Sequence, residues 1–226
     1  MGILKKESFS FLKSLSQNNN RDWFNAHKPD YLKAHENLIG FSDALLNEMN
    51  KHDHIETPTG KKALFRIYRD VRFSKNKTPY NTHWNGGYKR AGKKLRGSYY
   101  FYLSPGKSFV MSGFWGPDNE DMQRIRRNID LNLSDWKRML SAKPLVSAFG
   151  KLAGEQLIAA PRGYSKDHPG IELLRRKQFL LKQAFTDKEV LAPGFYKKAN
   201  EAFKKMRPFL DFMTEVLTTD LNGEPL

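Results

Sequence analysis

A β-hairpin pattern constrains the fold of this chain more than any other feature. Two aromatic-rich runs, 98–104 and 108–115, are separated by Ser104-Pro105-Gly106-Lys107. Proline at the second position and glycine at the third are the residues that a type II turn requires. In the run from Tyr99 to Tyr102 the aromatic rings alternate between two faces, so we expect one face to be buried and the other partly exposed. The sequence therefore predicts an antiparallel sheet that contains a hairpin at about 98–115.

Helical patterns lie on both sides of this hairpin. Phe9, Leu12 and Leu15 form a short apolar stripe, and a longer stripe with a period near 3.6 residues starts at Pro29 or Asp30 and runs to about residue 49. A C-terminal amphipathic helix covers about 195–213, and we expect Pro208 to kink or split it. Residues 177–185 fit a further strand.

These patterns predict an α+β fold with the sheet packed against N- and C-terminal helices. We expect one globular domain over residues 1–226. Its parts are a helical part at 1–51, a basic strand-rich part at 64–115, and helices with the strand at 177–185 in the part at 118–226.

Residues 64–74 alternate with the period of a strand. Phe65, Ile67, Val71 and Phe73 would share one face and polar residues the other, while Arg69 falls on the apolar face. We therefore predict a strand in which Arg69 finds a partner or lies at a bulge.

Residues 85–97 are interpreted as a flexible basic loop. Within it, residues 87–94 nearly match the phosphate-binding pattern G-x-x-x-x-G-K-[ST], but Lys94 stands where a hydroxyl would hold magnesium. We take this as a chance match. Tyr68-Arg69-Asp70 is likewise no kinase catalytic loop, because Lys75 stands at the place of the required asparagine.

Positive charge is concentrated in one segment. The chain of 226 residues has 39 Lys and Arg against 24 Asp and Glu, a net charge of +15. Residues 61–110 hold 13 of these bases and a single acid, Asp70, so they carry +12 by themselves, together with 11 of the 29 aromatic residues. Such a mixture suits contacts with phosphates and stacking on bases, although a solvated basic face has the same composition.

Other classes of protein are excluded or disfavoured. The absence of cysteine excludes disulfides, thiol catalysis and cysteine-ligated metal sites. No apolar run reaches the roughly 20 residues of a membrane span, and the N-terminus lacks the pattern of a signal peptide. We expect a soluble cytoplasmic protein without membrane contact, and the sequence leaves its oligomeric state open.

The candidate site is a set of basic residues around Asp70. The predicted anion-binding residues are Arg66, Arg69, Arg72, Ser74, Lys75, Lys77, Lys93 and Lys94. Arginine offers a planar fork that matches phosphate, and lysine a mobile point charge. Structural ion pairing is the alternative for Arg69 and Asp70. Asp70 and His83 are the candidates for an acid or base, and the histidines show no spacing typical of a metal site, so we predict no metal and no cofactor.

Four stretches resemble a known family. They are residues 11–31, 65–80, 99–117 and 168–179, and the most specific is R-x-x-R-D-x-R-F-S-K-[DN]-K-x-P-Y, complete from Arg66 to Tyr80. The chain resembles a family of conserved hypothetical proteins of bacteria and fungi, a domain of unknown function. The resemblance implies one globular domain, and it carries over no substrate and no catalytic residue.

Three functions remain open. The first is binding of a polyanion such as nucleic acid through residues 66–96, with Tyr100 and Tyr102 as a stacking platform beside Arg66 and Arg72. The second is an enzyme for a small phosphorylated or carboxylated substrate, held by Arg69 and Arg72, with Asp70 or His83 moving protons. The third is a protein that binds an acidic protein partner. The sequence does not decide between enzyme and binding protein, or between DNA, RNA and acidic protein.

Overall fold

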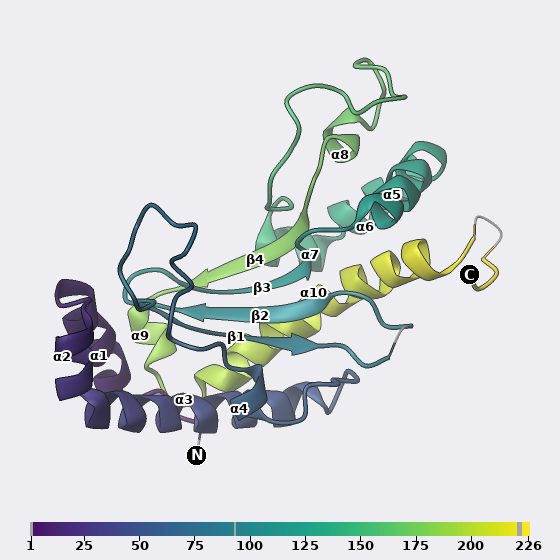
Figure 1. Ribbon diagram of the computed structural model, residues 1–226. Coiled ribbons are helices and arrows are strands. Elements are labelled where there is room, and N and C mark those ends of the chain that lie inside the picture. The colour runs from purple at the N-terminus through teal and green to yellow at the C-terminus, as the bar shows by residue number, and fades with distance from the viewer. Residues whose placement is uncertain (1, 93, 221–222) are drawn as a thin grey trace. The chain divides into compact units, whose positions relative to one another are not determined.

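The computed structural model describes residues 2–92, 94–220 and 223–226, and its centre is a four-stranded antiparallel sheet. The strands, in the spatial order β1-β2-β3-β4, are β1 (Trp84–Lys89), β2 (Ser98–Leu103), β3 (Ser108–Phe114) and β4 (Phe179–Phe185) (Figure 1). With the helices, they form the expected single-domain α+β fold.

The helices found among the described residues precede the sheet, follow its hairpin and end the chain. They are α1 (Lys6–Gln17), α2 (Arg21–Ala26), α3 (Lys28–Met49), α4 (Gly60–Ala63), α5 (Asn119–Leu131), α6 (Leu133–Ser141), α7 (Lys143–Phe149), α8 (Ile171–Leu174), α9 (Asp187–Val190) and α10 (Phe195–Thr218). The chain packs as two compact units. Unit 1 holds Met1–Lys89, Tyr100–Val110 and Ala184–Glu201, and unit 2 holds Arg90–Tyr99, Met111–Gln183 and Ala202–Leu226.

The hairpin of β2 and β3 confirms the strongest prediction from the sequence. Tyr99, Phe101 and Leu103 are buried, while Tyr100 and Tyr102 on the other face are half-buried. The strand predicted at 177–185 is also confirmed, as β4. The C-terminal helix is not split, because α10 runs through Pro208 without interruption.

Aromatic rings join the N-terminal helices of unit 1 to the segment that follows them. Asn20 caps α2 by accepting a hydrogen bond from the backbone N–H of Trp23 (2.9 Å). Phe24 of α2 is buried, and its ring stacks on Tyr80 at 4.0 Å between centroids and meets Tyr68 edge-on at 5.8 Å. These contacts fix the position of the chain that carries the candidate site.

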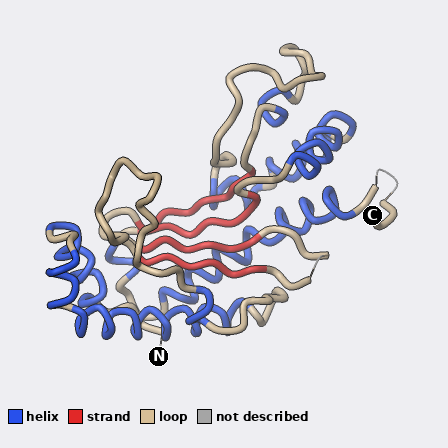
Figure 2. The backbone as a smooth tube through the Cα atoms, viewed as in Figure 1, coloured by secondary structure: helices blue, strands red, loops and turns tan. Residues whose placement is uncertain are grey.

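The strand predicted at 64–74 is wrong. The chain between α4 and β1 is irregular and is drawn as a loop in Figure 2. Its isolated bridges are Leu64 with Gly86 and Tyr68 with Tyr80. Period-2 alternation indicates a strand only where one face is buried, and here Phe65 and Phe73 of the supposed buried face are exposed.

The flexible loop predicted at 85–97 is also wrong, because its first part is β1. Trp84, Gly86 and Tyr88 are buried in alternation. Gly86 serves close packing, since a Cβ there would lie 2.7 Å from Cζ of Phe101 and 2.8 Å from the carbonyl oxygen of Ala63. Gly86 thus permits a close approach inside a strand, in a segment that we predicted to be a loop.

After β1, the rest of the segment predicted as a loop belongs to unit 2, where polar contacts hold Arg90 and Arg96 in place. The side chain of Arg90 is 2% exposed and forms an ion pair with Asp211 of α10, and it donates to the carbonyl oxygen of Arg96 (3.2 Å). Arg96 pairs with Asp121 of α5, and its backbone N–H donates to Oγ1 of Thr214 (3.1 Å). The segment between β1 and β2 is therefore attached to unit 2 at Arg90 and Arg96.

A capped turn in unit 1 precedes the C-terminal helix. Thr186 and Glu189 form a capping box at α9, in which the Glu189 carboxylate accepts from the backbone N–H of Thr186 (2.8 Å). Lys198 donates to the same carboxylate (2.5 Å). These hydrogen bonds, that of Lys198 first, lower the pKa of Glu189 to about 2.

Candidate functional site

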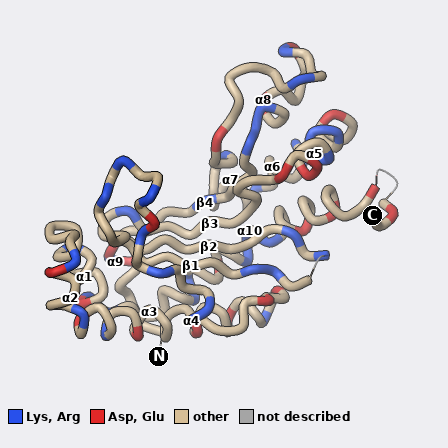
Figure 3. Tube along the Cα trace, viewed as in Figure 1, with Lys and Arg blue, Asp and Glu red and all other residues tan. Residues whose placement is uncertain are grey.

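Most of the predicted anion-binding residues lie on one loop of unit 1, residues 64–83, which we call the basic loop. Backbone hydrogen bonds close its base: Arg69 N–H donates to the carbonyl oxygen of Pro79 (2.9 Å), and Asn81 N–H to that of Ile67 (2.8 Å). Figure 3 shows several basic positions along this loop and one acidic position. The loop holds Arg66, Arg69, Arg72, Lys75 and Lys77 against Asp70, a net charge of +4.

Arg69 holds the loop together. Its guanidinium donates to the carbonyl oxygen of Thr78 (2.9 Å), to the Thr78 hydroxyl, and to Oγ of Ser74 (3.4 Å). Lys77 acts similarly, because its Nζ donates to the carbonyl oxygens of Val71 (3.0 Å) and Arg72 (3.4 Å). Arg69, Ser74 and Lys77 are thus brought together by contacts within the loop. Any contact of theirs with an external anion stays a prediction.

Asp70 and Arg72 form an exposed ion pair. Nε of Arg72 lies 3.0 Å from Oδ1 and Nη2 lies 2.7 Å from Oδ2, so the carboxylate receives both arms of the fork. The side-chain hydrogen bond from Arg72 lowers the pKa of Asp70. The carboxylate is therefore ionised at neutral pH and orients Arg72, and this geometry gives no support to Asp70 as a proton donor.

Arg66 and Lys75 are the free cations of the loop. Both are exposed, and neither side chain makes a hydrogen bond or an ion pair with any residue in the described part of the chain. The charge of Arg66 also contributes to the lowered pKa of Asp70, after the hydrogen bonds from Arg72. The loop therefore offers two exposed positive groups, Arg66 and Lys75, in addition to the Asp70–Arg72 pair.

Phe73 was not among the candidate site residues predicted from the sequence. We expected its ring on the buried face of a strand, but the residue is 96% exposed. The guanidinium carbon of Arg72 lies 5.8 Å from the ring centroid. The signal in the sequence was a single aromatic residue flanked by cations, Arg72-Phe73-Ser74-Lys75.

The ring of Tyr102 is not available for stacking on a base. Its centroid lies 4.3 Å from that of His83 and 4.9 Å from that of Phe109, with interplanar angles of 29° and 11°. His83 precedes β1 and Phe109 belongs to β3, the two neighbours of β2, so these rings flank Tyr102 from opposite sides. The platform that we expected on Tyr102 is therefore occupied by the protein's own rings.

The contacts of Tyr100 and His83 neither support nor exclude the roles that we predicted for these residues. Tyr100 accepts a hydrogen bond from Asn85 (3.0 Å) at its hydroxyl. Burial, followed by the charge of Arg69, lowers the pKa of His83, so this imidazole is neutral at pH 7. A role of His83 as a base stays a prediction.

Lys93 and Lys94, which we also predicted to bind an anion, are not part of the basic loop. Lys93 lies outside the described residues. Lys94 is exposed and belongs to unit 2, whereas the basic loop belongs to unit 1.

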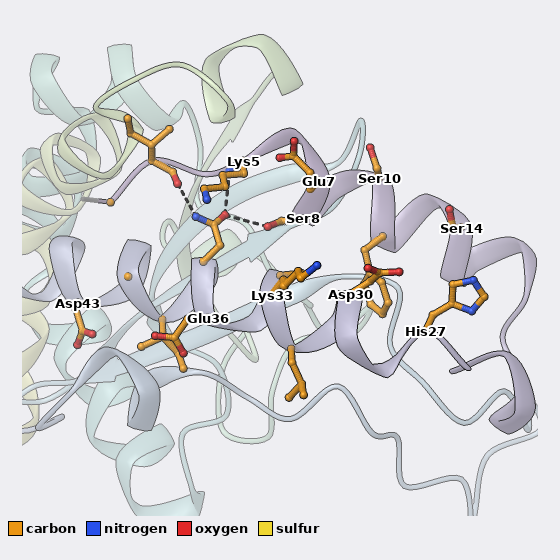
Figure 4. A pocket seen from close by; sticks show the side chains of 18 of the residues that line it. Lys5, Glu7, Ser8, Ser10, Ser14, His27, Asp30, Lys33, Glu36 and Asp43 are labelled. Atoms are coloured by element: carbon orange, nitrogen blue, oxygen red, sulfur yellow. Dashed lines mark hydrogen bonds between the residues drawn. The ribbon is translucent and has the colours of Figure 1, made fainter. Parts of the chain in front are cut away.

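A groove of about 1580 Å³ lies elsewhere in unit 1, along α1, α2 and α3. Figure 4 shows its side chains, which include the acidic Glu7, Asp30 and Glu36. Asn37, one of its lining residues, donates to the carbonyl oxygen of Ile3 (2.7 Å). No residue of the basic loop lines this groove, so it provides no pocket for a small substrate at Arg69 and Arg72.

Metal and membrane sites find no support in the part of the chain that the structure describes. No group of three or more His, Asp or Glu side chains there could hold a metal ion. Its helices are all too short or too polar to cross a membrane.

Comparison with known proteins identifies a family for this chain. No curated protein and no solved structure shows significant similarity to this chain. Residues 7–212 match the family described as conserved hypothetical protein (DUF2461). That match covers most of the 226 residues, and the chain therefore belongs to the DUF2461 family of conserved hypothetical proteins.

Proposed function

We propose that this protein binds nucleic acid through the basic loop. The observation that carries the proposal is the pair of free cations, Arg66 and Lys75, on a loop with five bases and one acid. An exposed cation without an internal partner is available to a phosphate, whereas a paired one must first exchange its carboxylate.

The fixed backbone of the loop supports this proposal. Arg69 and Lys77 use their hydrogen bonds to hold the chain around residues 71–78, and Arg69 N–H and Asn81 N–H close its base. A loop that is already ordered loses little conformational entropy when it binds, so more of the electrostatic attraction appears as affinity. Two of the cations thus position the loop, and others remain for the ligand.

The charge of the whole chain favours the same class of partner. A net charge of +15 attracts any polyanion over long distances and increases the rate of encounter. The basic loop adds a local contact surface. Phosphates of nucleic acid fit it because they present one negative charge per nucleotide in a regular row.

The test is fluorescence anisotropy of labelled single-stranded DNA, duplex DNA and RNA, at about 50 to 200 mM salt, where contacts with several phosphates lose affinity by orders of magnitude. The variant is Arg66→Ala with Lys75→Ala. A matched control is Lys204→Ala with Lys205→Ala, because these α10 residues are also exposed and their loss changes the net charge equally. We expect the loop variant to reduce the slope of log K against log salt by about 1.4 for single strands and about 1.8 for duplex, and the control to change it little.

Two results would count against the proposal. Equal slopes for the loop variant and the control would place the contact outside Arg66 and Lys75. Absence of binding by the unmodified protein at about 50 mM salt would remove nucleic acid as the partner, and an acidic protein would become the candidate.

A further inference from the structure

The exposed ring of Phe73 stands at the tip of the basic loop. Ser74 N–H donates to the carbonyl oxygen of Val71 (3.3 Å), which closes a reverse turn with Arg72 and Phe73 at its two central positions. The ring is 96% exposed, so it contributes almost nothing to the packing of the protein. A large apolar ring at the apex of a turn is free to contact a partner.

The turn that carries Phe73 is held from both sides. The carboxylate of Asp70 accepts hydrogen bonds from Nε and Nη2 of Arg72. Lys77 donates to the carbonyl oxygens of Val71 and Arg72, the residues at the start of the turn. The backbone around Phe73 is therefore positioned, and the guanidinium of Arg72 lies 5.8 Å from the centroid of its ring.

We propose that Phe73 stacks on an unpaired base, so that the basic loop binds single-stranded nucleic acid better than duplex. This inference rests on the proposed function and names its ligand class. Every base has an aromatic face, and stacking on a protein ring needs no particular sequence. In a duplex each base already stacks on its neighbours, and an inserted ring would first have to separate them.

Two other observations favour Phe73 as a contact for a base. The ring of Tyr102, which we expected to stack on a base, is covered by His83 and Phe109. Among the exposed rings of the basic loop, Phe73 is the most open at 96%, against 53% for Phe65 and 47% for Tyr68, and those two rings contact Tyr100 and Phe24. A lipid surface is a poorer match, because binding to it scales with buried apolar area and the tip of the turn offers a single ring among charged neighbours.

The test compares Phe73→Leu with Phe73→Tyr, using labelled oligo(dT) and oligo(rU) of about 12 nucleotides and a DNA duplex of equal length. Leucine keeps an apolar side chain but removes the ring, while tyrosine keeps the ring. We expect Phe73→Leu to weaken both single strands roughly 5- to 140-fold, and Phe73→Tyr to bind like the unmodified protein. Duplex affinity and every salt slope should stay unchanged, because no cation is lost.

A matched control is Trp115→Leu, which removes an aromatic ring that is 63% exposed and belongs to unit 2. It should leave all three affinities unchanged. The thermal midpoint of Phe73→Leu should equal that of the unmodified protein, since the ring is outside the core. A loss on either the DNA or the RNA strand supports stacking, and the two arms distinguish the sugar that the loop accepts.

The outcomes separate this inference from the proposed function. If Phe73→Leu binds single strands as tightly as the unmodified protein, while the slope still depends on Arg66 and Lys75, stacking is refuted and the proposed function stands. An equal loss on duplex and single strands also refutes stacking on an unpaired base. If the unmodified protein binds no nucleic acid, both proposals fail.

Discussion

Replacing Arg69 by lysine tests whether this side chain holds the basic loop. The guanidinium donates to the Thr78 carbonyl (2.9 Å), to the Thr78 hydroxyl and to Ser74 Oγ (3.4 Å), and a lysine can keep one of these bonds. Losing two bonds at about 1 kcal/mol each destabilises the closed loop by about 2 kcal/mol. That difference corresponds to an opening of the loop about 30-fold more frequent.

Amide hydrogen exchange measures this opening directly. The backbone N–H of Asn81, bonded to the carbonyl oxygen of Ile67 at the base of the loop, should exchange about 30-fold faster in Arg69→Lys. Arg66→Lys is the control, because the Arg66 guanidinium bonds to nothing in the described part of the chain and its charge is retained. Unchanged exchange of Asn81 in Arg69→Lys would refute the reasoning, since Arg69 would then not hold the loop.

Three further changes test other parts of the structure. Tyr88→Phe removes the hydroxyl that bonds Oγ (2.7 Å) and the carbonyl oxygen (3.0 Å) of Ser42 inside unit 1, so urea unfolding should show a loss of about 1–2 kcal/mol; equal stability would contradict the buried contact. Asp211→Ala leaves the buried charge of Arg90 without its carboxylate, and because Asp211 is partly exposed we expect a loss of about 2 kcal/mol in the same assay rather than the 3–5 kcal/mol of a fully buried pair. The pKa of Glu189 falls from 4.5 to about 2 on folding, so its carboxylate stabilises the protein above pH 4.5 and this contribution disappears as the pH falls toward 2. Glu189→Gln should therefore be less stable than the unmodified protein at pH 6, by up to about 1 kcal/mol for a partly exposed pair, with a difference that shrinks between pH 4.5 and 2; a constant difference would exclude this origin.

Local signals were sufficient to predict much of the fold. The hairpin was recognised from its turn residues and from the alternation of Tyr99 to Tyr102, and α1 and α3 from apolar residues at helical spacing. Each of these patterns describes how a short segment buries one face, so it holds whatever the segment packs against.

Contacts between distant segments caused the wrong predictions. Residues 85–97 were predicted as a flexible loop, yet the first part lies in β1, where Gly86 packs so closely against Phe101 and the carbonyl oxygen of Ala63 that no side chain would fit. Residues 64–74 alternate like a strand but form no strand, and their aromatic residues Phe65 and Phe73 remain exposed. Neither outcome can be derived from the local pattern, since each depends on which segment lies alongside.

In the candidate site, too, the sequence pattern does not determine what each residue contacts. Arg66, Arg69 and Arg72 follow one another at intervals of three, and composition treats them as three equal charges. The structure gives each a different environment: the Arg66 side chain has no partner among the described residues, Arg69 is hydrogen-bonded to Thr78, and Arg72 is paired with Asp70. These environments come from the reverse turn at 71–74 and the return of the chain to Thr78, which no periodicity encodes. Single replacements at the three positions should therefore differ in kind, because only the loss of Arg66 removes a charge without changing the loop.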